Sequence, residues 1–149
     1  MANDNDLASF DPRASIQRFY DAENAFCSAE QDQKDIQIML NELAPDIVVE
    51  VPASLPHGGI WRGHQGFKDL FDEVTKHFQE FVVVYNGAKW HQVDDGRILT
   101  KGTLRAVLSA NGQHIEMDVV SLFTFTDRGL SHLEHYYKDT AAIVLAGKA

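Results

Sequence analysis

The sequence has little that suits a membrane, a nucleic acid or an oxidising compartment. Its single cysteine, Cys27, cannot form an intramolecular disulfide, and no second thiol offers metal-binding spacing. Basic side chains number 13 against 22 acidic ones, which gives a formal net charge of −9. A field of that sign repels phosphate backbones and anionic lipids, so we expect neither nucleic-acid nor membrane partners.

Long hydrophobic runs are also missing. No apolar stretch approaches the roughly 18 residues that suggest a membrane span. The first six residues (MANDND) are polar and acidic, whereas a secretory or organellar leader is basic or apolar. Together with the lone thiol, this pattern favours a reduced, cytoplasmic protein.

Length and composition suit one globular domain. The chain has 149 residues, of which 44% are hydrophobic and 23% charged, and a chain of this size buries about two-thirds of its unfolded surface. Residues 1–12 are expected to form a flexible lead-in, and 13–146 a single domain.

The first half of the sequence has mainly helical periodicity. A helix is expected to start at Asp11-Pro12, because proline is tolerated in the first turn. Its apolar face has spacings of three and four residues and comprises Ile16, Phe19, Tyr20, Glu23, Phe26 and Cys27. A second helix is expected at about 33–44, ended by Pro45. A short strand at 47–51, a loop at 53–63 and an amphipathic helix containing Phe67 follow.

From about residue 80 the period changes to two. We expect four strands near 80–92, 97–109, 113–126 and 130–138, and then a short helix at 139–146. Hairpin turns are indicated at Asp95-Gly96, Asn111-Gly112 and Asp127-Arg128-Gly129. Asn86-Gly87 lies within the first strand and indicates a bulge or a bend rather than a chain reversal. The sequence therefore predicts an α+β fold, with helices covering one face of an antiparallel sheet.

The alternation within these strands predicts which side chains face inward. On the last strand, Leu133, His135 and Tyr137 share one side, and His132, Glu134 and Tyr136 share the other. His135 thus falls on the apolar side. A core histidine hydrogen-bonded to a neighbour would explain it, but a buried imidazole with a pKa near neutrality can also move protons.

The opposite side of the sheet carries charges of both signs. Lys101 and Arg105 are expected to pair across strands with Glu116, Asp118 or Glu134. A metal site at His114, Glu116 and Asp118 is the alternative. Those three side chains are spread too far along one strand to reach one ion easily, so no metal is expected.

Four more polar or aromatic residues are candidates for a site. Glu23 lies on the apolar face of the first helix, where an ionised carboxylate is costly unless paired or protonated. It either reaches water at the helix edge, orients His135, or acts as an acid. Tyr20 is either a core aromatic or a hydrogen-bond donor to a substrate carbonyl. His57 and Trp61 lie in the glycine-containing loop, His57 either as an exposed residue or as a site residue, and Trp61 packing or recognising a flat ligand.

The chain resembles the SnoaL-like group of the nuclear-transport-factor-2-like, or ketosteroid-isomerase-like, superfamily. The resemblance rests on Leu43–Pro52 (LAPDIVVEVP), Trp61-Arg-Gly63, Gly102-Thr103, Phe123-Thr-Phe125 and Leu133-Glu-His-Tyr-Tyr137, and it covers about residues 14–140. It implies a cone-shaped, curved sheet wrapped by N-terminal helices, a cystatin-like α+β barrel. It also implies a deep ligand pocket and a homodimer formed through the outer face of the sheet.

The same resemblance argues against two family mechanisms. Steroid isomerases use a tyrosine and two aspartates at positions that hold Phe19, Val51 and Ser121 here, so their mechanism is not expected. The arginine and aspartate of the limonene-epoxide hydrolases fall at Gly102 and Leu104. In polyketide cyclases and these hydrolases, a catalytic aspartate matches the position of His135.

The expected function is cofactor-independent acid–base catalysis, of the lyase, isomerase or cyclase type, on a small hydrophobic carbonyl compound. The alternatives are a non-catalytic ligand-binding or dimerising module and a subunit of a larger enzyme assembly. The expected catalytic residues are His135, Glu23 and Tyr20. Residues expected to bind substrate are Phe19, Val51, His57, Trp61, Ser121, Phe123 and Tyr137.

Overall fold

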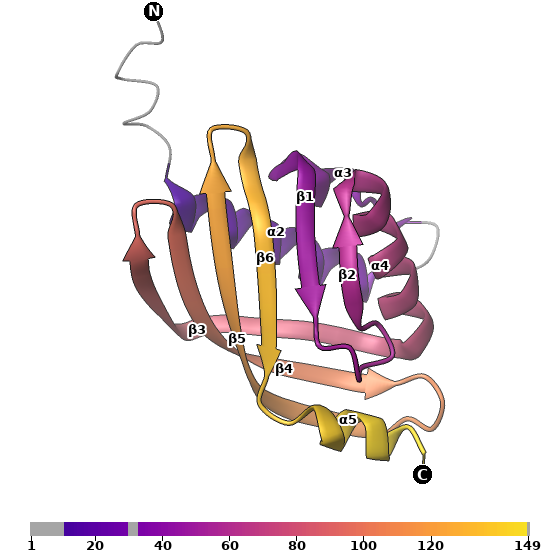
Figure 1. Ribbon diagram of the computed structural model, residues 1–149. Helices are drawn as coiled ribbons and strands as arrows, with labels where there is room; N and C mark the ends of the chain where they lie inside the picture. The colour runs from indigo at the N-terminus through magenta and orange to yellow at the C-terminus, as the bar shows by residue number, and fades with distance from the viewer. Residues whose placement is uncertain (1–10, 30–32, 149) are drawn as a thin grey trace, which may run out of the picture.

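A computed structural model describes residues 11–29 and 33–148, with only the backbone described at 85–88. The first ten residues of the expected lead-in lie outside this range. Six strands form one sheet in the order β2-β1-β6-β5-β4-β3. Helix α2 (Pro12–Ser28) runs behind the sheet, and α4 (Gly63–His77) lies beside β2 (Figure 1).

Helix α2 begins where the sequence indicates and buries most of its expected apolar face, and α4 contains Phe67 as expected. The Asp11 side chain accepts a hydrogen bond from the backbone N–H of Arg13 at 3.0 Å, and this caps α2. Helix α2 buries Ile16, Phe19, Tyr20, Glu23 and Cys27, among others. Helix α4 buries Phe67, Leu70, Phe71 and Val74. These stripes place both helices against the same core.

The expected second helix at 33–44 is wrong. Only Gln37–Leu40 is helical (α3), and strand β1 already begins at Leu43 and runs to Val51. Strand β1 begins earlier than the expected residue 47 because its first residue, Leu43, pairs in parallel with Leu130 of the last strand. Pro45 lies inside this strand, where the register shifts between Leu43 and Val48. A proline is accommodated there because an irregular stretch does not need its N–H in the ladder.

The expected loop at 53–63 also contains regular structure. Strand β2 (Gly59–Arg62) pairs antiparallel with β1, and Trp61 lies opposite Val49. A strand of four residues among glycines is too short to show a period of two, and the sequence therefore gives little sign of it.

The second half of the chain follows the expected meander. It consists of β3 (Phe78–Asp94), β4 (Arg97–Leu108), β5 (His114–Thr126), β6 (Gly129–Tyr137) and α5 (Thr140–Ala146). The predicted bulge or bend is confirmed by a register shift between Val84 and Lys89. The sheet is mixed rather than wholly antiparallel, because β1 pairs parallel with β6.

The sheet curls into a half-barrel. Strands β3 and β4 bend across its lower end in Figure 1, so the concave face is closed on one side by the sheet itself. The predicted alternation is confirmed: Leu104, Phe123 and Leu133 are buried on the concave side. No helix in the described part of the chain is long and apolar enough to cross a membrane.

Candidate functional site

A narrow pocket lies between the helices and the concave face of the sheet. The space between its side chains totals about 490 Å³ including the opening to solvent, but only about 30 Å³ admits the centre of a water-sized sphere. Its lining is mostly apolar, with six polar side chains: Tyr20, Glu23, His57, Ser121, His135 and Tyr137. A ligand larger than a few waters therefore needs the lining side chains to move apart.

His135 extends from β6 into this pocket. Its Nδ1 is hydrogen-bonded to the Ser121 hydroxyl at 2.8 Å, and the two residues are direct cross-strand partners. Burial lowers the pKa of His135 to about 4, so the imidazole is neutral at pH 7. A hydroxyl can donate or accept, and the pair can therefore present Nε2 either as a base or as a donor. The group that orients His135 is Ser121, not Glu23 as considered from the sequence.

His57 is buried in the lining of the pocket rather than exposed in the loop, with 1% of its surface accessible. Its Nε2 is hydrogen-bonded to the Tyr137 hydroxyl at 2.9 Å. Burial, with smaller contributions from the charges of His135 and His77, lowers the pKa of His57 to about 3. Burial also raises the pKa of Tyr137 well above its ordinary value, so its phenol remains a hydrogen-bond donor.

Glu23 extends from α2 into the same pocket and is 4% exposed, which excludes a carboxylate reaching water at the helix edge. Within residues 11–29 and 33–148, its carboxyl has neither a hydrogen-bond nor an ion-pair partner. Burial raises the pKa of Glu23 to about 8. The carboxyl is therefore mostly protonated at pH 7 and can donate a hydrogen bond.

The aromatic residues of α2 form one wall. Tyr20 packs edge-on against Phe19 and Phe123, with ring centroids 5.6 and 5.4 Å apart. Phe19 lines the pocket, whereas Phe123 is fully buried behind it. Phe123, expected from the sequence to bind substrate, does not line the pocket but packs against two rings that do.

The loop and β2 close the side nearest β1. Val51 lines the pocket, but Trp61 does not. The indole Nε1–H of Trp61 donates to the backbone carbonyl of His57 at 3.1 Å. Trp61 therefore fixes the loop that carries His57, which is a packing role.

The sequence did not assign several apolar lining residues. They come from α4 and from β1, β3, β4, β5 and β6: Val49, Phe67, Leu70, Phe71, Val74, Phe81, Val83, Leu104, Val119 and Leu133. The periodicity of the sequence does predict that these residues lie on the apolar faces of their helices and strands. What periodicity does not reveal is which members of a stripe border a gap and which fill the core.

The pocket thus holds an acid and a base that are both uncharged at pH 7. The raised pKa keeps the carboxyl protonated, so that it can act as an acid, and the lowered pKa keeps the imidazole unprotonated, so that it can act as a base. General acid–base chemistry needs these two protonation states. When His57 Nε2–H donates to the Tyr137 oxygen, the O–H of Tyr137 is left as a donor suited to a carbonyl oxygen. The arrangement can take a proton at His135 Nε2 and give one at Glu23.

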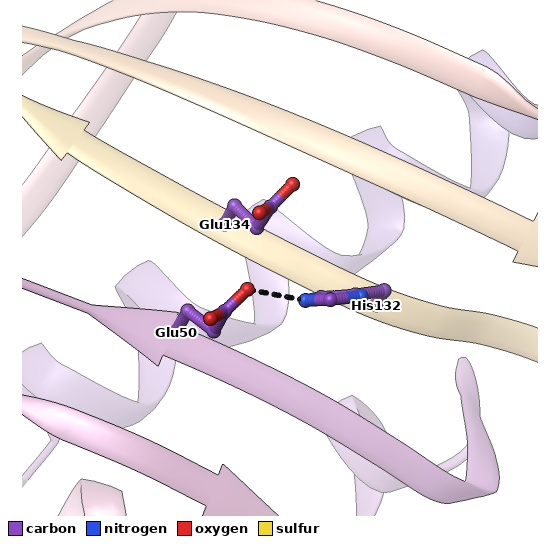
Figure 2. A group of neighbouring side chains, drawn as sticks. All are labelled: Glu50, His132 and Glu134. Carbon is purple, nitrogen blue, oxygen red and sulfur yellow. Dashed lines mark hydrogen bonds and ion pairs between the residues drawn. The ribbon is translucent and has the colours of Figure 1, made fainter.

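A second polar cluster lies on the opposite, convex face of the sheet. His132 Nε2 lies 2.7 Å from a carboxylate oxygen of Glu50, and Glu134 projects beside them from the same strand as His132 (Figure 2). Ligand atoms of the three lie within 4.8 Å of one another. They could hold a metal ion, but the close His132–Glu50 pair already gives this cluster a structural explanation.

The metal alternative at His114, Glu116 and Asp118 is not supported. Arg105 pairs with Glu116 at 3.1 Å, and Lys101 pairs with Asp118 at 3.6 Å. The cross-strand pairing expected from the sequence is therefore confirmed for both cations, and these exposed pairs add little stability each.

Comparisons with known proteins agree with this architecture. A nuclear-transport-factor-2-like protein of unknown function from Burkholderia pseudomallei is 21% identical, with a TM-score of 0.77, covering 93% of this chain and 98% of that chain. TerC, co-crystallised with polyporic acid, is 20% identical with a TM-score of 0.75, covering the same shares. A proposed polyketide cyclase from Xanthomonas campestris is 17% identical with a TM-score of 0.68, covering 85% of this chain and 90% of that chain.

No curated protein matches the sequence. The family model of the SnoaL-like domain matches residues 16–131, most of the chain. The chain belongs to the SnoaL-like family.

Proposed function

We propose that this protein is a cofactor-independent acid–base catalyst of the isomerase, lyase or cyclase type. Its substrate is a small hydrophobic carbonyl compound. The observation that carries this proposal is the pairing of a neutral imidazole and a protonated carboxyl, His135 and Glu23, inside one apolar pocket. The co-crystal of TerC with polyporic acid supports a pocket that takes a small organic molecule in this fold.

In the proposed reaction, His135 Nε2 removes a proton from the carbon next to the carbonyl group. Nδ1–H then donates to Ser121 Oγ, which holds the ring in the required tautomer. The phenol of Tyr137 and the carboxyl of Glu23 donate hydrogen bonds to the oxygen on which negative charge develops, with Tyr20 as a further candidate. The proton is returned at another atom for isomerisation, or lost with a leaving group for a lyase.

The test uses 2-tetralone, a flat ketone with acidic protons beside its carbonyl. Exchange of these protons in D₂O, followed by NMR, is expected to exceed the buffer rate. His135→Ala and His135→Gln should each reduce the enzymatic rate by about 10²–10⁴-fold, with affinity changed less than a few-fold. His132→Gln is the matched control, because that imidazole lies on the convex face of the same strand. Full exchange activity in both His135 variants would rule out His135 as the proton carrier.

The second candidate is a ligand-binding or dimerising module without catalysis. The observation in its favour is the narrowness of the pocket, about 30 Å³ for the centre of a water-sized sphere. Binding of 2-tetralone with no exchange above the buffer rate would select this candidate.

We also propose a homodimer through the convex face of the sheet and a cytoplasmic location. Ile60 and Tyr136 expose 57% and 56% of their surfaces. Strand alternation places both on that face with Glu50 and Glu134. The single, buried thiol suits a reducing compartment.

A further inference from the structure

The polar groups that face the pocket have an unusual charge balance. Among the described residues that line it there is no lysine or arginine, and Glu23 is the one acidic side chain. Histidines 57 and 135 are neutral above about pH 6, since burial holds both pKa values near 3 and 4. At neutral pH the pocket thus presents no charge with which an ionic ligand could pair.

From this geometry we infer that the pocket selects uncharged ligands near neutral pH, and that ionisation of Glu23 converts it into a site for a small organic cation. The inference rests on the proposed function only in using the same pocket. It concerns binding and needs no turnover.

Between about pH 6 and pH 9 an anion is excluded for the same reason. A carboxylate entering the pocket loses its hydration and meets no cation, which costs several kcal/mol. A neutral carbonyl compound instead finds donors at Glu23 and Tyr137 and an acceptor at His135. An uncharged ligand with one acceptor and one donor matches these groups.

Glu23 is the group that can change this selectivity. Helix α2 also brings Tyr20 and Cys27 near it, β6 brings His135 and Tyr137, and the loop before β2 brings His57. The residues that α4, β1, β3 and β4 contribute to the pocket are apolar, and β5 contributes Ser121 and Val119.

Of these groups, Cys27, Tyr137, His57 and His135 do not change charge between about pH 6 and pH 9. Burial raises the pKa of the Cys27 thiol and of the Tyr137 phenol, while both histidines are already neutral. Lys34, a cation outside the pocket, donates to the backbone carbonyl of Phe26 at 2.7 Å and lowers the pKa of Cys27. Above about pH 8 Glu23 therefore becomes an unpaired buried anion, and a bound cation would neutralise it.

The test compares three probes of almost equal size and shape: benzamide, benzoate and benzamidinium. Each keeps its charge between pH 6 and pH 9. By calorimetric titration at pH 6, benzamide is expected to bind at least about tenfold more tightly than either ion. At pH 9, benzamidinium should gain about tenfold or more, whereas benzoate should remain weak.

Glu23→Gln keeps the shape and removes the charge. It should retain the preference for benzamide at both pH values and lose the gain of benzamidinium at pH 9. Glu134→Gln, on the convex face, is the matched control and should keep that gain. Circular dichroism checks that both variants fold.

Three results would overturn the inference: benzoate binding as tightly as benzamide at pH 6, a benzamidinium gain that persists in Glu23→Gln, or no binding of any probe. Failure of the proposed function is recognised separately. In that case the three probes bind with the expected dependence on charge and pH, but the His135 variants leave proton exchange unchanged.

Discussion

A carboxyl group buried without a partner makes stability depend on pH in a direction opposite to the usual one. Folded Glu23 keeps its proton to about pH 8, whereas in the unfolded chain it ionises near its ordinary value of 4.5. Between these values the folded state binds more protons, so the free energy of unfolding falls as pH rises. Burying the charge is the cause.

Glu23→Gln should therefore become more stable than the wild type as pH rises. The difference in unfolding free energy is expected to grow between about pH 4.5 and pH 8 and to reach roughly 4 kcal/mol. His135 and His57 act with the opposite sign below pH 6.5, but they are common to both proteins and cancel. Urea unfolding at a series of pH values measures the difference. A constant difference across this range would contradict an uncharged Glu23 in the folded protein.

In the proposed reaction Ser121 acts through His135, to which it is hydrogen-bonded, and this role would make it a positioning residue. Ser121→Ala should leave the pKa of His135 low, because burial sets it, but should remove the bond that fixes the tautomer. We expect the ¹⁵N shifts of the imidazole to move toward a mixture of tautomers, and 2-tetralone exchange to slow about tenfold with KM nearly unchanged. Ser131→Ala is the control, since Ser131 Oγ donates to the backbone of Thr124 instead. Unchanged shifts in Ser121→Ala would contradict the orienting role.

At the scale of elements, the side chain of Asn24 on α2 makes two hydrogen bonds to the edge strand β3. Asn24 donates to the carbonyl of Val83 at 2.9 Å and accepts from its N–H at 3.0 Å. Because β3 ends the sheet, these two backbone groups have no neighbouring strand on that side. Asn24 thus satisfies both groups and seats the helix over the pocket.

Asn24→Ala should cost about 1–3 kcal/mol of unfolding free energy, because it leaves both backbone groups of Val83 unsatisfied. Asn24→Asp should also destabilise, since it loses the donor. Gln17→Ala is the control on the same helix, where an exposed bond to Asp21 is lost. Denaturant unfolding measures all three. Equal stabilities of Asn24→Ala and Gln17→Ala would show that the edge contact is unimportant.

Helices and strands whose periodic pattern spans many residues could be predicted from the sequence. Segments that are strands only because they pair with a distant strand could not. The stripes of α2 and α4 and the alternation of β5 and β6 exceed two periods, so the inward position of His135 followed from the sequence. Strand β1 between Leu43 and Ile47 exists because it pairs with β6, which no local pattern records. The His57–Tyr137 bond joins residues 80 apart, and for that reason the sequence left open whether His57 is buried or exposed.

At the scale of the whole molecule, its net charge of −9 opposes any pairing of two copies. A dimer formed by the apolar side chains of the convex face should therefore tighten when salt screens this repulsion, whereas one held by ion pairs should weaken. Sedimentation velocity is expected to show twice the 16.7 kDa mass of the chain, with a larger dimer fraction at high salt.

Ile60→Lys combined with Tyr136→Lys should produce monomers, because two more charges are placed in an apolar contact. Ile38→Lys is the control: Ile38 is equally exposed, but it lies on α3, away from the convex face. The Lys variants also raise the net charge toward zero, so the weakening of a dimer in the double variant cannot come from long-range repulsion. If the wild type stays monomeric at high salt, the proposed dimer does not form. If the double variant still dimerises, the interface lies on another surface.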